Sequence, residues 1–293
     1  MKTAFKSSVN RLLSAFDVHV LKRSTFYSLK AIEAENYRLR SQATVAQAGP
    51  DIQRNPLENF NHLATLSLTK RRQEHLASLG LDLVNKSVLE VGAGIGDHTG
   101  FFLDRGCTIL STEARPENLV VFRDRWLHQF GWYRNIKKLT IGQLDIDHPP
   151  AHFPHQFEIV YCYGVLYHLE NPLPAIDFMS RCCTSMLLLE TSVSIGDDEE
   201  YIMHGEEDSA NVSQSIHGKG CHPTRPWIFN RLKERFPYVY MPVTQPWHEQ
   251  FPIDWTSEVE TLYFAKRAVF IASRQKLNCP LLVEAVPDKQ RRM

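Results

Sequence analysis

The chain has 293 residues, of which 43% are hydrophobic and 23% charged, with 33 basic and 33 acidic side chains. This length exceeds the usual size of a single domain, and the composition is that of an ordinary globular protein, which excludes fibrous and disordered classes. A net charge near zero argues against a duplex-DNA binder, because the phosphate-contacting face of such proteins makes the domain basic.

Cysteine usage and hydropathy predict the compartment. The six cysteines contain no CxxC pair, and several lie inside apolar runs, where a free thiol packs as a small hydrophobe. The sequence has no apolar run of about 18 residues, and its N-terminus lacks an apolar signal core followed by a cleavage site. We therefore expect a cytoplasmic protein in a reducing environment.

The first 46 residues are basic and have a helical pattern. Their apolar side chains at helical spacing include Leu12, Leu13, Phe16 and Val20. Such a face suits packing on the rest of the protein, a homodimer contact or a peripheral membrane contact.

A linker and a further helix follow this basic segment. Gly49-Pro50 and Asn55-Pro56 mark the linker, and the pattern predicts a helix over 57–79 that ends at Gly80. We therefore expect a helical N-terminal extension over residues 1–80.

From Ser87 onward, short strands alternate with helices. The pattern predicts strands near 87–91, 107–112, 137–142, 157–163 and 183–191, and helices near 96–105, 116–130 and 171–181. Helices between strands imply parallel pairing with right-handed crossovers. Ligands on such sheets bind at the carboxyl ends of the strands. Four residues with suitable chemistry fall there: Glu90, Glu113, Asp145 and Gly164.

A polar insert at 193–224 interrupts this alternation. It holds seven acids and three histidines, His204, His217 and His222, and an insert of this length is typical of a lid or a binding segment. A helix in TRPWIFNRLKERF and strands in YVYMPV and RAVFIAS follow it. We therefore predict an α/β domain over 81–275, with a doubly wound, mostly parallel seven-stranded sheet, and a tail over 276–293.

Three alternate glycines follow the first predicted strand, in VLEVGAGIGDHTG. A dinucleotide fold would show GxGxxG with an acid about 20 residues further on, whereas the spacing here is GxGxG. The stretch E-V-G-A-G-I-G resembles the first motif of class I S-adenosylmethionine-dependent methyltransferases. The segments TILSTEARPEN, GQLDID and FEIVYCYGVLYHLENP resemble the succeeding parts of that family in order. The resemblance covers roughly residues 82–192 and implies a Rossmann-like fold.

The resemblance also implies S-adenosylmethionine as cofactor and assigns residues to it. The bend through Gly92, Gly94 and Gly96 would let the nucleoside and its amino-acid tail lie against bare backbone. By analogy with family members, Glu90 would organise the contacts to the ammonium and Glu113 would contact the ribose hydroxyls. Asp145 and Ile146 would contact the adenine, and the carbonyls of Tyr163 and Gly164 would lie near the sulfonium. A carboxylate suits the ribose because its paired acceptors match a vicinal diol.

Methyl transfer from a sulfonium is an in-line displacement, so a catalytic base is optional. If the acceptor is a hydroxyl, His168 is the first candidate base and His98 the second. The alternatives are a packing role for His168 and a helix-capping role for His98. Undiminished turnover after His168→Gln would exclude the base role.

Several residues are candidates for the acceptor side. Cations and aromatic rings suit a carboxylate, a phosphate or a sugar face, and the candidates are Tyr167, His217, His222, Arg225 and Trp227, with Gln245, His248 and Trp255 as further ones. The tryptophans are equally consistent with core positions. We expect no metal, because no ligand spacing such as HxxxH or CxxC occurs.

The segment YGVLYHLENPLPAI also resembles the transferase that carboxymethylates the wobble uridine of tRNA. That enzyme carries a helical N-terminal extension and uses a carboxylated cofactor. A tRNA enzyme should present a coherent basic surface, whereas positive charge here gathers at the N-terminus and the insert is acidic. The sequence therefore favours methylation of a small-molecule or glycan-like acceptor on oxygen. The alternatives are a tRNA wobble-uridine (carboxy)methyltransferase and a non-catalytic cofactor-binding scaffold.

Overall fold

The computed structural model describes residues 55–204, 208–256 and 266–293, all of which belong to one compact unit. The helices expected within residues 1–46, with their membrane or dimer contacts, lie outside the described residues. No helix within these ranges is long and apolar enough to cross a bilayer.

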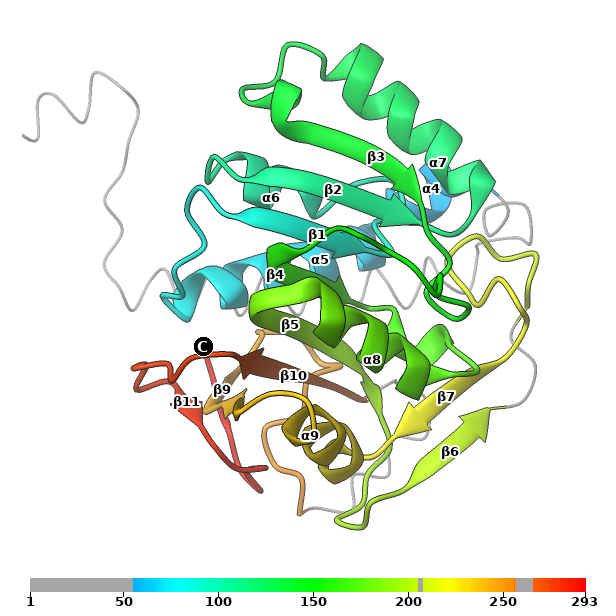
Figure 1. Ribbon diagram of the computed structural model, residues 1–293. Helices are drawn as coiled ribbons and strands as arrows, with labels where there is room; N and C mark the ends of the chain where they lie inside the picture. The colour runs from blue at the N-terminus through cyan, green and yellow to red at the C-terminus, as the bar shows by residue number, and fades with distance from the viewer. Residues whose placement is uncertain (1–54, 205–207, 257–265) are drawn as a thin grey trace, which may run out of the picture. The chain divides into compact units, whose positions relative to one another are not determined.

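The core of the fold is a twisted sheet of eight strands in the order β11-β8-β10-β5-β4-β1-β2-β3 (Figure 1). Its strands are β1 (Ser87–Val91), β2 (Thr108–Glu113), β3 (Leu139–Gln143), β4 (Phe157–Tyr163), β5 (Cys183–Val193), β8 (Tyr238–Pro242), β10 (Lys266–Ser273) and β11 (Leu282–Val283). Strands β1 to β5 pair in parallel, and β10 is antiparallel to both of its neighbours. The predicted doubly wound, mostly parallel sheet is confirmed, with eight strands where seven were predicted, because β11 adds one at the edge.

Helices cover both faces of this sheet. They are α4 (Pro56–Phe60), α5 (Leu63–Ser78), α6 (Thr99–Leu103), α7 (Pro116–Arg123), α8 (Pro172–Cys182) and α9 (Arg225–Lys233). A π-helical turn, η1 (Asp124–Gln129), continues α7 over the rest of the predicted helix. Side chains of α8 and α9 join one core, and side chains of α5, α6 and α7 join the other.

Alternation along the strands produces these two cores. On β4, Ile159, Tyr161 and Tyr163 belong to the core beneath α5, α6 and α7, whereas Val160 and Cys162 belong to the core beneath α8 and α9. Successive side chains of a strand point to opposite faces, so a strand buried on both sides is apolar throughout. This explains why FEIVYCY contains so few polar residues.

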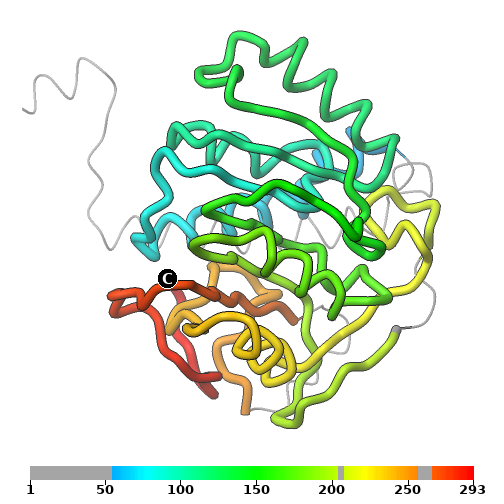
Figure 2. Tube along the Cα trace, viewed as in Figure 1, coloured from blue at the N-terminus to red at the C-terminus, as the bar shows by residue number. Residues whose placement is uncertain are grey.

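The insert forms a small hairpin beside the main sheet. Strand β6 (Tyr201–His204) pairs antiparallel with β7 (Gly220–Pro223). The described part between them lies at the end where the parallel strands terminate, in yellow in Figure 2. The Arg115 guanidinium, just before α7, donates hydrogen bonds to the carbonyls of Ser209, Gln214 and Ser215 at 2.9 to 3.3 Å. The insert is therefore held over the carboxyl ends of the strands.

The segment expected as a tail is part of the structure. Strand β11 extends the sheet beyond β8, and β12 (Arg291–Arg292) pairs in parallel with β9 (Thr244–Gln245). Gln290 accepts a hydrogen bond from Trp255 Nε1 at 2.8 Å and donates one to the Pro242 carbonyl at 2.6 Å. These bonds tie the last residues to the strands before them.

Candidate functional site

The glycine bend connects β1 to α6 with backbone angles that favour glycine. Gly92, Gly94 and Gly96 have φ of 65°, 57° and 85°. An added Cβ would lie 2.3 Å from Val165 at Gly92 and 2.8 Å from Phe60 at Gly94. The bend therefore requires glycine for its conformation and for its close packing.

Glu113, at the end of β2, fastens this bend to its neighbouring strand. Its carboxylate accepts hydrogen bonds from Gly94 N at 2.8 Å and from Arg115 N at 3.0 Å. Burial raises the pKa of this carboxyl, and the backbone donors oppose that rise. An acid held in this way has a fixed orientation beside the glycine backbone.

Glu90, near the carboxyl end of β1, is almost completely buried. Oε2 accepts hydrogen bonds from Thr99 Oγ1 at 2.7 Å and Ser111 Oγ at 2.5 Å. Oε1 is buried and has no hydrogen-bond partner among the described residues. Burial raises the pKa of Glu90 to about 7, against the effect of the two hydroxyl donors.

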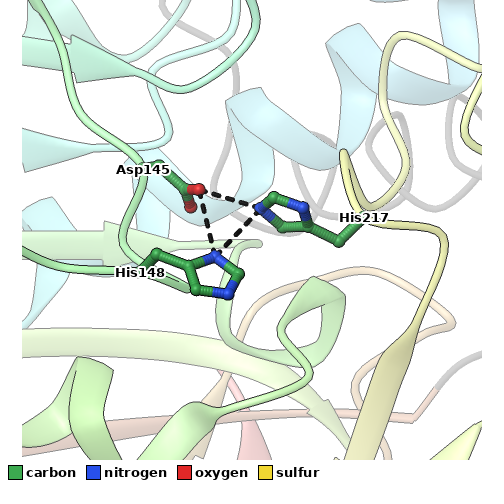
Figure 3. A group of neighbouring side chains, drawn as sticks. All are labelled: Asp145, His148 and His217. Atoms are coloured by element: carbon green, nitrogen blue, oxygen red, sulfur yellow. Dashed lines mark hydrogen bonds and ion pairs between the residues drawn. The ribbon is translucent and has the colours of Figure 1, made fainter.

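Asp145 follows β3 and meets two imidazoles (Figure 3). Its Oδ2 lies 2.8 Å from His217 Nε2 and 3.3 Å from His148 Nδ1, and the two nitrogens are 3.2 Å apart. Its Oδ1 accepts a hydrogen bond from Asp147 N at 2.9 Å. Asp145, the residue expected to contact the adenine, thus belongs to a larger polar group that joins the loop after β3 to the insert.

A cavity of about 650 Å³, open to solvent, lies between the bend and the insert. The predicted site residues that line it are Gly92, Gly94, Glu113, Asp145, Ile146, Gly164 and His168. Its insert wall is formed by 212–216, and Phe60 of α4 closes one end. Glu90, Gly96 and Tyr163 do not line the cavity and lie behind its wall.

Two stacked tyrosines and a histidine stand behind the bend. The rings of Tyr161 and Tyr163 stack at 4.4 Å, and Tyr161 Oη lies 2.9 Å from His98 Nδ1. Burial and the nearby Arg72 charge lower the pKa of His98 to about 3. An imidazole in this position is neutral at pH 7, so the structure favours a hydrogen-bonding role for His98 over that of a strong base.

Two buried arginines share one carboxylate beside Gly164. Arg72 Nη2 of α5 lies 2.6 Å from Glu190 Oε2, and Arg267 Nη1 of β10 lies 3.2 Å from Glu190 Oε1. An added Cβ at Gly164 would lie 3.0 Å from Arg72 Nη2. We call these three side chains the arginine cluster. Sequence reasoning missed it, since its members are distant in the chain and carry no spacing signal.

The other predicted acceptor residues are dispersed. Tyr167 accepts a hydrogen bond from Arg267 Nη2 at 3.0 Å, and its ring is 6.3 Å from that of His222. Trp227 instead stacks on Tyr201. Arg225 donates to the Pro287 carbonyl at 2.6 Å and covers the Trp255 ring at 3.9 Å, away from the cavity.

The further candidate His248 lies near the arginine cluster. Burial lowers the pKa of His248 to about 3, and the charges of Arg72 and Arg267 contribute to that shift. Gln245 is buried, and its amide has no hydrogen-bond partner among the described residues. His204 is the last residue of β6.

Comparison with known proteins identifies the family of the central region. Residues 89–185 match the family model described as a methyltransferase domain. A tRNA U34 carboxymethyltransferase of Pseudoalteromonas atlantica is 30% identical over 142 residues, which cover 47% of this chain and 40% of that protein. One from Helicobacter pylori is 29% identical over 120 residues, which cover 38% of this chain and 44% of the relative. The chain therefore spans about two fifths of the length of these curated relatives.

A solved structure shares the fold. The N-terminal domain of EvdMO1, crystallised in the presence of S-adenosylhomocysteine and D-fucose, superposes with a TM-score of 0.53 at 18% identity, covering 71% of this chain and 83% of that one. At this identity the likeness establishes the fold alone.

Proposed function

Because the chain carries a class I methyltransferase domain, we propose that its glycine bend and the neighbouring carboxylates bind S-adenosylmethionine or a derivative of it. One observation carries this proposal: Gly92, Gly94 and Glu113 line one cavity with Asp145 and Ile146. In this arrangement Glu113 accepts from the ribose hydroxyls, and Ile146 packs on the adenine. Gly164 marks the sulfonium end.

Glu113 is the residue that tests the cofactor proposal. We expect calorimetry to detect binding of S-adenosylhomocysteine, and Glu113→Gln to weaken it by about 10- to 150-fold, since hydrogen bonds to charged groups contribute about 1.5–3 kcal/mol. The matched control is Glu284→Gln, an exposed change far along the chain. Absence of heat with the folded wild-type protein would contradict the proposal.

When bound, such a cofactor supplies an electrophilic carbon on a sulfonium. The chain's contribution is alignment and exclusion of water, with Val165 and residues 212–216 of the insert as walls. His168 lines the cavity beside Gly164 and Val165 and stays the candidate proton acceptor.

For the transferred group, we propose carboxymethyl, and for the acceptor, a uridine of tRNA. The curated relatives bear this activity in their names, and they favour it over the small-molecule or glycan acceptor that the sequence suggested. The arginine cluster supports the same choice. Its two guanidiniums and one carboxylate leave an excess positive charge in a buried place.

Charge balance gives the physical reason. Within the part of the chain that the structure describes, neither Arg72 nor Arg267 has a second carboxylate within 4.0 Å. The Arg267 charge also contributes to lowering the pKa of Arg72, although burial is the larger cause. A plain methyl sulfonium would add a second uncompensated cation here, whereas a carboxylate on the transferred carbon would neutralise the excess.

Donor preference tests this assignment. We expect the protein to move a carboxymethyl group from carboxy-S-adenosylmethionine to tRNA uridine, and Arg72→Met to lower that rate by about 10- to 100-fold, since each charge-assisted hydrogen bond contributes about 1.5–3 kcal/mol. The substitution leaves Glu190 paired one to one with Arg267, so the fold should tolerate it. Nucleoside mass spectrometry measures the product.

Lys70→Met, an exposed change in the same helix, is the control. Methyl transfer from S-adenosylmethionine to sugars, with no transfer to tRNA from either donor, would restore the small-molecule or glycan acceptor. Cofactor binding without transfer to any acceptor would favour the scaffold alternative.

A further inference from the structure

We propose that Asp145, His148 and His217 bind a divalent transition-metal ion, of which Zn²⁺ is the reference case, at the mouth of the cavity. We call these three residues the mouth triad. Asp145 and His148 come from the loop after β3, and His217 comes from the insert. Figure 3 shows that the carboxylate and both imidazoles direct one atom each toward a common point.

The spacing of the three atoms fits one metal ion. They are separated by 2.8, 3.3 and 3.2 Å. Ligand atoms at about 2.0–2.2 Å from a zinc ion in tetrahedral arrangement lie about 3.3–3.6 Å from each other. A bound ion would therefore require the shortest separation in this triad to lengthen by about 0.5–0.8 Å.

Hydrogen bonds alone do not account for the mouth triad. An ionised carboxylate only accepts, and each imidazole nitrogen either donates or accepts. If both nitrogens donate to Asp145 Oδ2, two N–H groups face each other across 3.2 Å. If the nitrogen of one imidazole accepts a hydrogen bond from the other, its lone pair faces the lone pairs of Asp145 Oδ2. While Asp145 is ionised, at least one of the three contacts is therefore repulsive whatever protons the two imidazoles carry, whereas a cation attracts all three lone pairs.

The donor set indicates the class of metal. Two imidazoles and a carboxylate suit Zn²⁺, Fe²⁺, Co²⁺ or Ni²⁺, whereas Mg²⁺ and Ca²⁺ prefer oxygen ligands. The side chains of His148, Asp145 and His217 are 60%, 33% and 33% exposed, so an ion can enter and water can complete its coordination.

The position of the triad links the metal to the cavity. Residues 212–216, immediately before His217, form the insert wall of the cavity. Lys219, two residues after it, pairs with Glu170 at 2.7 Å. An ion shared between His217 and the β3 loop would hold this wall in place and slow the exit of any molecule beneath it.

The first experiment uses Zn²⁺ alone, after treatment of the full chain with a chelator. We expect calorimetry to find a site that His148→Ala and His217→Ala each weaken by at least about tenfold, since even the partners of metal ligands contribute 10–100-fold. His152→Ala, an exposed histidine of the same loop, is the matched control and should leave affinity unchanged. Mg²⁺ should not compete.

Spectroscopy gives a second readout. Co²⁺ in place of Zn²⁺ should show visible absorption bands that change in His217→Ala and persist in His152→Ala. Absence of a Zn²⁺ site, or a site indifferent to both His148→Ala and His217→Ala, would overturn the proposal. Neither measurement requires the cofactor, so failure here is distinct from failure of the proposed function.

A linked measurement addresses the cavity. If the metal holds the insert wall, Zn²⁺ should tighten binding of S-adenosylhomocysteine, and by linkage that ligand should tighten Zn²⁺ by the same factor. Equal affinities with and without Zn²⁺ would overturn this coupling and leave the metal site itself intact.

Discussion

At the scale of single residues, Glu90 shows how burial changes the chemistry of one carboxyl. It lies inside the sheet at 1% exposure, and its Oε1 has no hydrogen-bond partner among the described residues. Burial raises its pKa from 4.5 to about 7, although Ser111 and Thr99 donate to it. Glu90, behind the proposed ammonium site, is thus about half protonated at pH 7 before a cation arrives.

This shift predicts a dependence of stability on pH. The unfolded carboxyl ionises near pH 4.5 and the folded one near pH 7, so the free energy of unfolding falls as pH rises through that window. We expect the free energy of unfolding of Glu90→Gln minus that of the wild type to be about 2 to 3 kcal/mol larger at pH 8 than at pH 5. Urea unfolding at the two pH values measures this difference.

Glu284→Gln, in contrast, should follow the wild-type curve at both pH values, because this side chain is exposed. If Glu90→Gln followed it as well, Glu90 would be ionised in the folded protein at pH 5.

At the scale of elements, the bend between β1 and α6 packs on protein as well as on the cavity. Gly92 and Gly94 line the cavity, whereas Gly96 faces α7 and η1. An added Cβ at Gly96 would lie 2.4 Å from Phe122 Cε2 and from Trp126 Nε1. The third glycine of the motif therefore allows helix packing, and its expected contact with the cofactor stays a prediction.

Alanine substitutions separate conformation from packing. Gly80 has φ of 64° and open space around it, so Gly80→Ala should cost about 1 to 2 kcal/mol for its left-handed backbone alone. Gly96→Ala, with φ of 85° and both aromatic rings in the way, should cost about 1 to 3 kcal/mol more. Thermal or urea unfolding compares the two variants, and equal losses would contradict the packing role.

At the scale of the whole molecule, the site depends on contacts between distant parts of the chain. The arginine cluster joins α5, β5 and β10. His75 of α5 is buried and approaches the Thr244 carbonyl at 3.0 Å. Helix α5, expected within an N-terminal extension, therefore contacts β5 through Arg72 and β9 through His75. The position of a domain boundary near residue 80 stays a prediction.

The sequence alone determined the fold class and the region of the cavity. Apolar strands between amphipathic helices can be buried only in a parallel sheet covered on both faces, so the strands from β1 to β5 lie within a few residues of their predicted bounds. Gly92 and Gly94 were recognisable because a bend with positive φ favours glycine, and Glu113 because TILSTEARPEN resembles the corresponding segment of the methyltransferase family.

Only the tertiary structure decided which side chains meet beyond that bend. Arg72, Glu190 and Arg267 come together because β10 pairs with β5 in the sheet and α5 brings Arg72 to Glu190, and no local pattern encodes that contact. The same is true of His217, which meets Asp145 across 72 residues because Arg115 holds the insert against the strand ends. Local geometry is determined by neighbours in sequence, whereas charge clusters are determined by packing, which depends on the whole chain at once.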